Sequence, residues 1–197
     1  MIKDFVAHCQ ICQQPKAERV KYHGLLITMD FIEGLPTSHS YNCIMVVVDK
    51  LSKYAHFVPL SHPFTAYKVA LVFMDNIFKL HGLPESIISD RDKVFTSTLW
   101  IDLFRLAGTK LQMSTACHPQ TDGQIEWVNQ CLEGYLRCFV HSCPNKWKDW
   151  LALAEFWYNT SYHSSLEKTP FEVLYGQPPR HLGMWLKHVL SLTYKNG

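Results

Sequence analysis

The first third of the chain alternates short apolar runs with polar turns. The apolar runs are LLITMDFI at 25–32, IMVVVD at 44–49 and YAHFVPL at 54–60. Each is short and rich in β-branched or aromatic residues, which is typical of buried strands. The turn-rich stretch GLPTSHSYN separates the first two runs. Three successive strands of this kind predict an antiparallel meander.

From Thr65 onward the apolar residues recur at helical spacing, interrupted by short strand-like runs. The pattern predicts helices over 65–81, 95–108, 121–141 and 147–162, and strands over 86–89 and 109–113. Gly82 and Gly108 are typical helix stops. The element order is therefore β-β-β-α-β-α-β-α-α. It predicts an α/β fold with a mixed sheet and helices on both faces.

Composition fits one globular domain and excludes few functions. The 197 residues suffice for one sizeable core, and 47% are hydrophobic against 18% charged. A net charge of +2 is too small to indicate a polyanionic partner by itself. No apolar run is long enough for a signal peptide or a membrane span, so we expect a soluble, intracellular protein.

The seven cysteines do not resemble the framework of a secreted domain. Only Cys9 and Cys12 are closely spaced, and the other five are scattered. We therefore expect free thiols, most of them buried.

Two aspartates occupy unusual positions relative to the predicted strands. Asp30 lies inside an apolar strand, where an ionised carboxylate is costly unless it is paired or binds a metal. Asp90 directly follows the strand 86–89, and ligands of open α/β sheets bind at such strand ends. If the strands 25–32 and 86–89 are neighbours, the two carboxylates meet.

A third acid, Glu126, lies early in the helix that HPQTDGQIE opens. We expect Thr121 to cap this helix, with Gln124 completing a capping box. The predicted core face comprises Ile125, Val128, Leu132, Leu136 and Phe139, and a separate polar stripe comprises Glu126, Asn129, Gln130, Glu133 and Arg137. This geometry leaves Glu126 free to point into a cleft.

Each of these acids also has an ordinary interpretation. An Asp beside a strand is usually a turn or cap residue, and a helical Glu is usually solvated. Among the other acids, we interpret Asp49 as an edge or ion-pair residue, and Asp92, Asp102 and Asp122 as surface or cap residues. Considered alone, the three acids give only a weak indication of a metal site.

Histidines, tryptophans and basic residues also have ordinary interpretations. His56, His81 and His118 are interpreted as packing or capping residues, and no chemistry is assigned to them. Trp147, Trp150 and Trp157 could stack on bases, but their helical spacing favours a core or subunit interface. Phosphate contacts near the cleft could come from five basic residues: Lys50, Lys53, Arg91, Lys93 and Lys110.

Several motifs together resemble a known family. TMDFIEGLP, VVVDKLSKYAHFVPL, LHGLPESIISDRDKVF, HPQTDGQIE, LEGYLR and YNTSYHSSLEKTPFEVLYG occur in order between about residues 27 and 180. They resemble the integrase catalytic core of gypsy-type long-terminal-repeat retrotransposons, of the retroviral-integrase type. The resemblance implies a ribonuclease-H-like fold with a mixed five-stranded sheet flanked by helices.

The resemblance also implies a chemistry and its residues. The catalytic acids of the DDE superfamily fall by motif on Asp30, Asp90 and Glu126, and positions 91–125, 35 residues, separate the last two. In the family these carboxylates bind two Mg²⁺ ions, which Mn²⁺ can replace. A hard cation of this kind suits three carboxylates. The implied activity is DNA integration, the joining of element DNA ends to target DNA, by a homo-oligomer in the nucleus.

The chain departs from the family pattern at several positions. Family members carry an amino-terminal zinc module with two His and two Cys, of which only Cys9 and Cys12 are found here. We interpret residues 1–24 as a remnant of that module, 25–180 as the catalytic core and 181–197 as an unstructured tail. Zinc at Cys9 and Cys12 is not expected, because two ligands cannot close a tetrahedral site.

The helix after the catalytic glutamate and the later loop also differ from the family. Trp127 and Gln130 stand where arginines would grip phosphate, and Glu167 replaces a glycine-like position. Two alternatives therefore stay open: an inactive nucleic-acid-binding remnant of an integrase, and a ribonuclease-H-like nuclease.

Overall fold

A mixed five-stranded sheet forms the centre of the computed structural model, which describes residues 24–114 and 119–180. The strands are β1 (Leu26–Ile32), β2 (Cys43–Asp49), β3 (Ala55–Leu60), β4 (Ser86–Ser89) and β5 (Lys110–Met113), in the spatial order β3-β2-β1-β4-β5. The predicted ribonuclease-H-like fold, a mixed five-stranded sheet flanked by helices, is confirmed.

The central strand β1 pairs antiparallel with one neighbour and parallel with the other. On one side β1, β2 and β3 form the predicted antiparallel meander, with Asp30 opposite Val46. On the other side β4 pairs parallel to β1, and β5 pairs parallel to β4. The carboxyl ends of β1 and β4 therefore lie side by side, which is the condition for their acids to meet.

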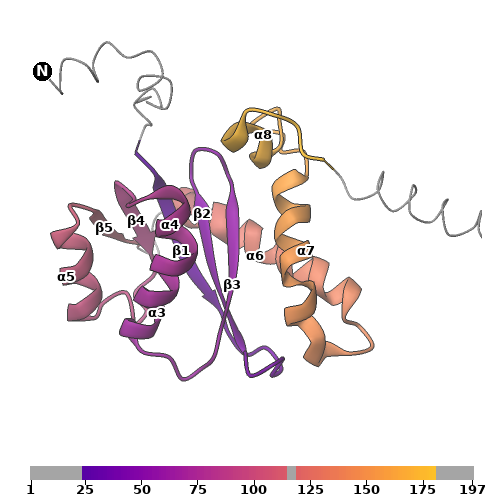
Figure 1. The fold of residues 1–197 in the computed structure, drawn as a ribbon, viewed down its shortest axis with the longest axis horizontal. Coiled ribbons are helices and arrows are strands. Elements are labelled where there is room, and N and C mark those ends of the chain that lie inside the picture. The colour runs from indigo at the N-terminus through magenta and orange to yellow at the C-terminus, as the bar shows by residue number, and fades with distance from the viewer. Residues whose placement is uncertain (1–23, 115–118, 181–197) are drawn as a thin grey trace, which may run out of the picture.

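Helices cover both faces of this sheet (Figure 1). They are α3 (Ala66–Phe73), α4 (Lys79–His81), α5 (Thr98–Leu106), α6 (Pro119–Phe139), α7 (Trp147–Thr160) and α8 (Pro170–Tyr175). A π-helical segment, Met74–Phe78, joins α3 to α4, and a short 3-10 turn, Pro144–Lys146, precedes α7.

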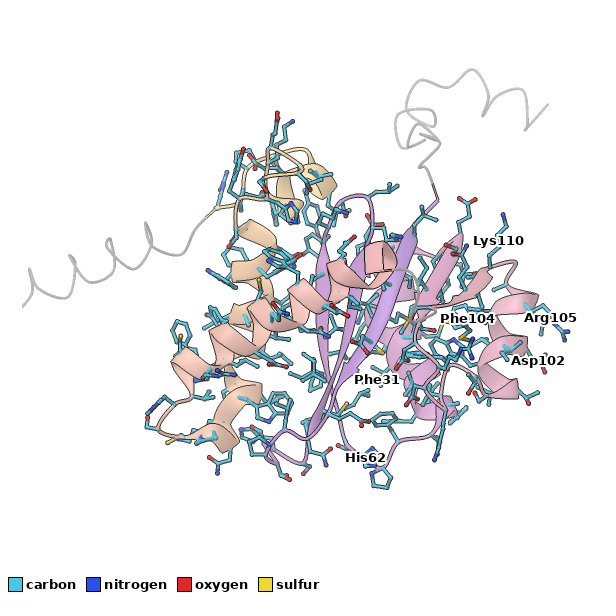
Figure 2. All side chains as sticks on the ribbon, turned by 180° about the vertical axis from the view of Figure 1, so that it is seen from behind. Phe31, His62, Asp102, Phe104, Arg105 and Lys110 are labelled. Atoms are coloured by element: carbon cyan, nitrogen blue, oxygen red, sulfur yellow. The ribbon has the colours of Figure 1, made fainter. Side chains whose placement is uncertain are left out.

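Two apolar clusters, one on each face of the sheet, form the core. On the face covered by α3 and α5, Phe73, Trp100 and Phe104 are fully buried and pack ring against ring. On the opposite face, Val128 and Leu132 of α6 pack with Trp147 of α7. Seen from behind, α6 runs across this face of the sheet (Figure 2). The second cluster therefore fixes the helix that carries Glu126.

The start and the outer face of α6 differ from the sequence prediction. The helix begins at Pro119, so Thr121 lies inside its first turn instead of preceding it. The side chain of Gln124 bonds the β2–β3 turn, where Gln124 Oε1 accepts from Lys53 Nζ at 2.9 Å. Phe139, expected on the core face, is 48% exposed because α6 extends past the sheet there.

Helix α8 was not predicted, although its sequence contains a clear start signal. Thr169 and Glu172 form a reciprocal capping box around Pro170, and Gly176 ends the helix in a left-handed conformation with φ of 70°. The pattern T-P-x-E is a recognisable helix start, but the six-residue helix is too short to show apolar periodicity.

The expectation that most thiols are buried is wrong for the described cysteines. Cys43 of β2 is buried and Cys131 is partly buried, whereas Cys138 and Cys143 are exposed. Both exposed residues lie at the outer end of the α6–α7 hairpin, beyond the sheet, which explains their exposure. All four thiols are free.

Several expectations concern residues outside the described part of the chain. They include the zinc interpretation of Cys9 and Cys12, the assignments of residues 1–23 and 181–197, and the roles of Cys117 and His118. The side chain of Asp122 is also outside the description. In the ranges 24–114 and 119–180 we find no helix of sufficient length and apolarity to cross a membrane.

Glu167 stands at a strained backbone position, which explains the glycine-like position noted in the sequence. Its φ is +54°, in the left-handed region that disfavours side chains. Glu167→Gly is therefore expected to raise the free energy of unfolding by about 0.5–1 kcal/mol in urea denaturation. The same change at Glu133, on the exposed face of α6, should lower it by about 1 kcal/mol. Equal decreases in the free energy of unfolding for Glu167→Gly and Glu133→Gly would contradict backbone strain at Glu167.

Candidate active site

Strand register brings the first two acids together. Met29 pairs with Ser89 in the parallel β1–β4 ladder, so the next residues, Asp30 inside β1 and Asp90 just after β4, lie at the same level. Both line a hollow of about 230 Å³ at this end of the sheet, and Glu126 of α6 lines its other side. The remaining lining residues are Thr28, Met29, Ile88, Ser89, Ser114 and Ile125. The structure therefore places all three candidate acids around one hollow.

The carboxylate of Asp30 is held by hydrogen bonds to both oxygens. Its Oδ1 accepts from the backbone N–H of Phe31 at 2.8 Å, and its Oδ2 accepts from Asn129 Nδ2, also at 2.8 Å. Asn129 lies one helical turn after Glu126 on the polar stripe of α6. Asn129 was expected on that stripe, but its contact with Asp30, which orients the carboxylate toward the hollow, was not predicted.

An aromatic stack ties the loop after Asp90 to the end of β1. The rings of Phe31 and Phe95 are parallel within 3°, with centroids 4.9 Å apart. Phe31 is labelled on the central strand in Figure 2. Within the loop, Asp90 Oδ1 accepts from the backbone N–H of Asp92 at 3.1 Å. The stack packs this loop against β1, while the Asp90 side chain itself is exposed.

Glu126 reaches the hollow from a helix fixed by its neighbours. Ile125 and Val128 are buried in the cluster beneath α6, whereas Glu126 is exposed. The apolar and polar faces of α6 therefore separate as the sequence predicted at this position. A Glu side chain has three rotatable bonds, so Glu126 can adjust to a ligand without moving the helix.

The donor set around the hollow suits a hard divalent cation. Carboxylate and hydroxyl oxygens are the ligands that Mg²⁺ prefers. Two buried oxygens next to the acids, Thr28 Oγ1 and Asn129 Oδ1, lack a hydrogen-bond partner among the described residues. Unpartnered buried oxygens beside carboxylates are typical of a site that takes a cation or its water.

The three acids line the hollow, but their carboxylates do not converge on a common position. Among residues 24–114 and 119–180, no three His, Cys, Asp or Glu side chains are close enough to hold a metal ion together. Carboxylates repel one another when no cation separates them. Asp90 and Glu126 have exposed, rotatable side chains that can approach Asp30 once a cation is present.

Asp49, Asp92 and Asp102 have ordinary structural roles, although Asp49 bonds Ser52 in a turn where an edge or ion-pair role was expected. Asp49 Oδ2 accepts from the backbone and the hydroxyl of Ser52, which closes the β2–β3 turn. Asp92 Oδ1 accepts from the backbone N–H of Val94, and Asp102 forms an ion pair with Arg105 at 2.8 Å.

The candidate phosphate-binding residues do not form one cluster. Lys50 and Lys53 lie in the turn after β2, and Arg91 and Lys93 in the loop after Asp90. Lys110 lies on the edge strand β5, at the far side of the sheet from α7 and α8 (Figure 2). Contacts by Lys110 would therefore belong to a different surface from those of Lys53.

The tryptophans of α7 are mainly structural, as expected. Trp147 is buried and donates from Nε1 to the carbonyl of Pro36 at 2.7 Å. Trp150 is partly buried against Phe139. Trp157 is 42% exposed and contacts Tyr135, so it lies at a surface.

The predicted packing histidines form a hydrogen-bonded relay between β3, α4 and α7. His56 Nδ1 lies 3.2 Å from Glu155 Oε1, and His56 Nε2 lies 2.8 Å from His81 Nε2. Because the carboxylate only accepts, His56 carries its proton on Nδ1, and His81 donates to His56 Nε2. Burial, and then the neighbouring His56, lower the pKa of His81 from its ordinary value of 6.5, although Asp49 opposes this shift.

This lowered pKa predicts loss of stability in mild acid. The folded state binds a proton at His81 less readily than the unfolded state does, so its contribution is present above about pH 6.5 and decreases below that value. Thermal melts at pH 7.5 and 5.5 should show a smaller acid-induced fall in Tm for His81→Gln than for the parent. His62→Gln, on an exposed loop, serves as control and should keep the parental fall. Identical falls in all three proteins would contradict this account.

Comparisons with known proteins relate the chain to transposons. It is 37% identical over 190 residues to the Transposon Tf2-3 and Tf2-4 polyproteins of Schizosaccharomyces pombe. These alignments cover 90% of the chain but only 14% of each polyprotein, so the chain spans about one seventh of the curated relatives it matches. No family model matches the chain.

Solved structures share its fold. The catalytic core of HTLV-2 integrase in complex with magnesium matches with a TM-score of 0.60 and 18% identity, over 76% of this chain and 95% of that one. The core of BIV integrase matches at 0.61 and 21%, over 76% and 93%. A chain of the simian T-cell lymphotropic virus intasome in complex with PP2A regulatory subunit B56 gamma matches at 0.65 and 16%, over 91% and 68%. These likenesses show the fold.

Proposed function

Because both its relatives and its fold support an integrase core of a long-terminal-repeat retrotransposon, we propose that this chain is the catalytic part of a DNA strand transferase. The substrates are the ends of the element DNA and a target duplex, and the reaction joins a DNA 3′-hydroxyl to a target phosphate. The site of action is the nucleus, where the target DNA lies.

One observation carries the proposal: Asp30, Asp90 and Glu126 line the same hollow, although they belong to three segments that are distant in sequence. These residues would hold Mg²⁺ or Mn²⁺ through their carboxylate oxygens. When bound, a pair of such cations supplies activation of the attacking hydroxyl and neutralises charge at the phosphorus and the leaving oxygen. The magnesium in the HTLV-2 core structure is consistent with this assignment.

The residues of the chain contribute positioning. The backbone N–H of Phe31 and the side chain of Asn129 already orient the Asp30 carboxylate. Little conformational entropy of this side chain therefore remains to be lost when substrate binds. Asp90 and Glu126 are exposed and approach from opposite sides, from the β4 end and from α6. The catalytic groups of the proposal are thus one fixed carboxylate and two adjustable ones.

A second copy of the chain is the other proposed partner. Several large apolar side chains on the outer surfaces of α6 and α7 are exposed: Phe139, Leu153 and Trp157. Exposed aromatic residues of this kind favour contact with another protein surface. Joining two DNA ends also requires two catalytic sites in one assembly.

The test is a strand-joining and disintegration assay on end-labelled DNA, with Mg²⁺ or Mn²⁺ and with EDTA as control. The expected result is a joined product that forms only with the divalent cation. Cleavage of nucleic acid without joining would support the nuclease instead. Binding of DNA with no product under either cation would support the inactive remnant.

A further inference from the structure

A second hollow, of about 520 Å³, opens on the same part of α6 as the acidic one. It is lined by Lys53 from the β2–β3 turn, by Gly123, Gln124 and Trp127 of α6, and by Tyr162, His163, Ser164 and Ser165 after α7. Its volume is within the range of sites for small organic ligands, about 300–1,000 Å³. None of the acids of the proposed active site lines it.

Trp127 gives this hollow an exposed aromatic surface. The residue is 47% exposed although its ring contacts Tyr158 and His163, with centroids 5.9 Å and 5.4 Å away. Those contacts fix the ring, so little conformational entropy remains to be lost when a planar group stacks on it. Nucleobases stack on such rings without regard to sequence.

Lys53 gives the same hollow a positioned cation. Its Nζ donates to the carbonyl of Lys50 at 2.7 Å and to Gln124 Oε1 at 2.9 Å. A lysine ammonium has three N–H donors, and two of them are used in bonds among the described residues, which leaves one for a ligand. Lys53 and His163 both line the hollow. Burial, and then the charge of Lys53, lower the pKa of His163. An anion bound between them would attract the Lys53 ammonium and accept a hydrogen bond from the His163 ring.

Hydroxyl groups complete the lining. Ser165 Oγ lies 3.1 Å from His163 Nδ1, and Ser164 is exposed beside it. Hydroxyls can both donate and accept, so they suit the mixed edge of a base or the oxygens of a sugar. An aromatic surface, a cation and hydroxyls together match the three parts of a nucleotide.

We propose that this hollow binds an unpaired nucleotide of the DNA end, with its base stacked on Trp127 and its phosphate at Lys53. The inference rests on the proposed function and deepens it, because it names the form of the substrate: a duplex end with a single-stranded overhang. Glu126, adjacent to Trp127 in sequence, lines the acidic hollow, so both sites can contact one DNA end. Trp127 stands where the family pattern has an arginine, so stacking replaces a phosphate contact.

The test measures binding in the absence of divalent cations, so that it does not depend on catalysis. Fluorescence anisotropy compares a blunt duplex with the same duplex carrying a three-nucleotide overhang. The parent should bind the overhang duplex about tenfold more tightly. Trp127→Ala should remove that preference, and Trp127→Phe, which keeps an aromatic ring, should retain most of it. Circular dichroism establishes that each variant is folded.

Tyr67→Ala is the control, since Tyr67 of α3 is also an exposed aromatic residue but lies outside the hollow. It should keep the parental preference. Lys53→Gln should weaken overhang binding and reduce its salt dependence by about one phosphate contact. Equal binding of blunt and overhang duplexes by the parent, or an unchanged preference in Trp127→Ala, would overturn the inference. A preserved preference in a chain that joins no DNA would leave this inference standing and reject the proposed function.

Discussion

Glu126→Gln is expected to reduce strand joining at least about a thousandfold while the protein stays folded. The amide keeps the size and helix propensity of the side chain but removes the charge that a cation requires. Because Glu126 is exposed beside the buried Ile125 and Val128, the helix loses no packing. Joining is measured on labelled DNA at saturating Mn²⁺, and folding by thermal melting.

The control for this change lies on the same helix. Glu133 is also an exposed glutamate of α6, but it does not line the acidic hollow, so Glu133→Gln should join DNA at the parental rate. Added Mg²⁺ should raise the Tm of the parent and of Glu133→Gln more than that of Glu126→Gln, because a ligand of the native state stabilises it by mass action. An active Glu126→Gln protein would exclude Glu126 from the site.

Asn129→Ala is expected to raise the Mn²⁺ concentration for half-maximal joining by about 10–100-fold. Asn129 acts through Asp30 as a positioning residue, since its Nδ2 is the donor to Asp30 Oδ2. Without that bond the carboxylate loses its fixed orientation, and cation binding must restore it. Joining at saturating Mn²⁺ should fall much less than the cation affinity.

A positioning role for Asn129 predicts that its loss weakens Mn²⁺ affinity more than the joining rate at saturating Mn²⁺. A merely structural role does not predict this difference. Gln130→Ala removes the neighbouring exposed polar side chain of α6 and should leave the Mn²⁺ requirement unchanged. If Asn129→Ala lost stability and joining together while keeping its Mn²⁺ requirement, the orienting role of the hydrogen bond would be wrong.

Local sequence patterns predicted the elements that periodicity can reveal. The strand over 86–89 has the predicted bounds, and the three earlier strands agree within a residue. Apolar spacing also separated the two faces of α6 near Glu126. It failed at Phe139, because periodicity does not show where a helix extends past the sheet that it covers.

Contacts between distant segments could not be derived from these patterns. The meeting of Asp30 and Asp90 depends on the parallel pairing of β1 with β4, which the sequence analysis could state only as a condition. The bond from Asn129 to Asp30 joins residues 99 positions apart. The pairing of Gln124 with Lys53 likewise replaced the local capping box expected with Thr121, because the β2–β3 turn packs against the start of α6.

The most direct test of the central claim is to locate Mn²⁺ by anomalous diffraction from crystals of the chain soaked in the cation. The account predicts a peak in the acidic hollow, about 2.1 Å from carboxylate oxygens of Asp30 and Asp90, with Glu126 turned toward it. Crystals of Glu126→Gln should show a weaker peak there. A hollow without Mn²⁺ at saturating concentration, or a peak only at another position such as the His56–His81 pair, would contradict the account.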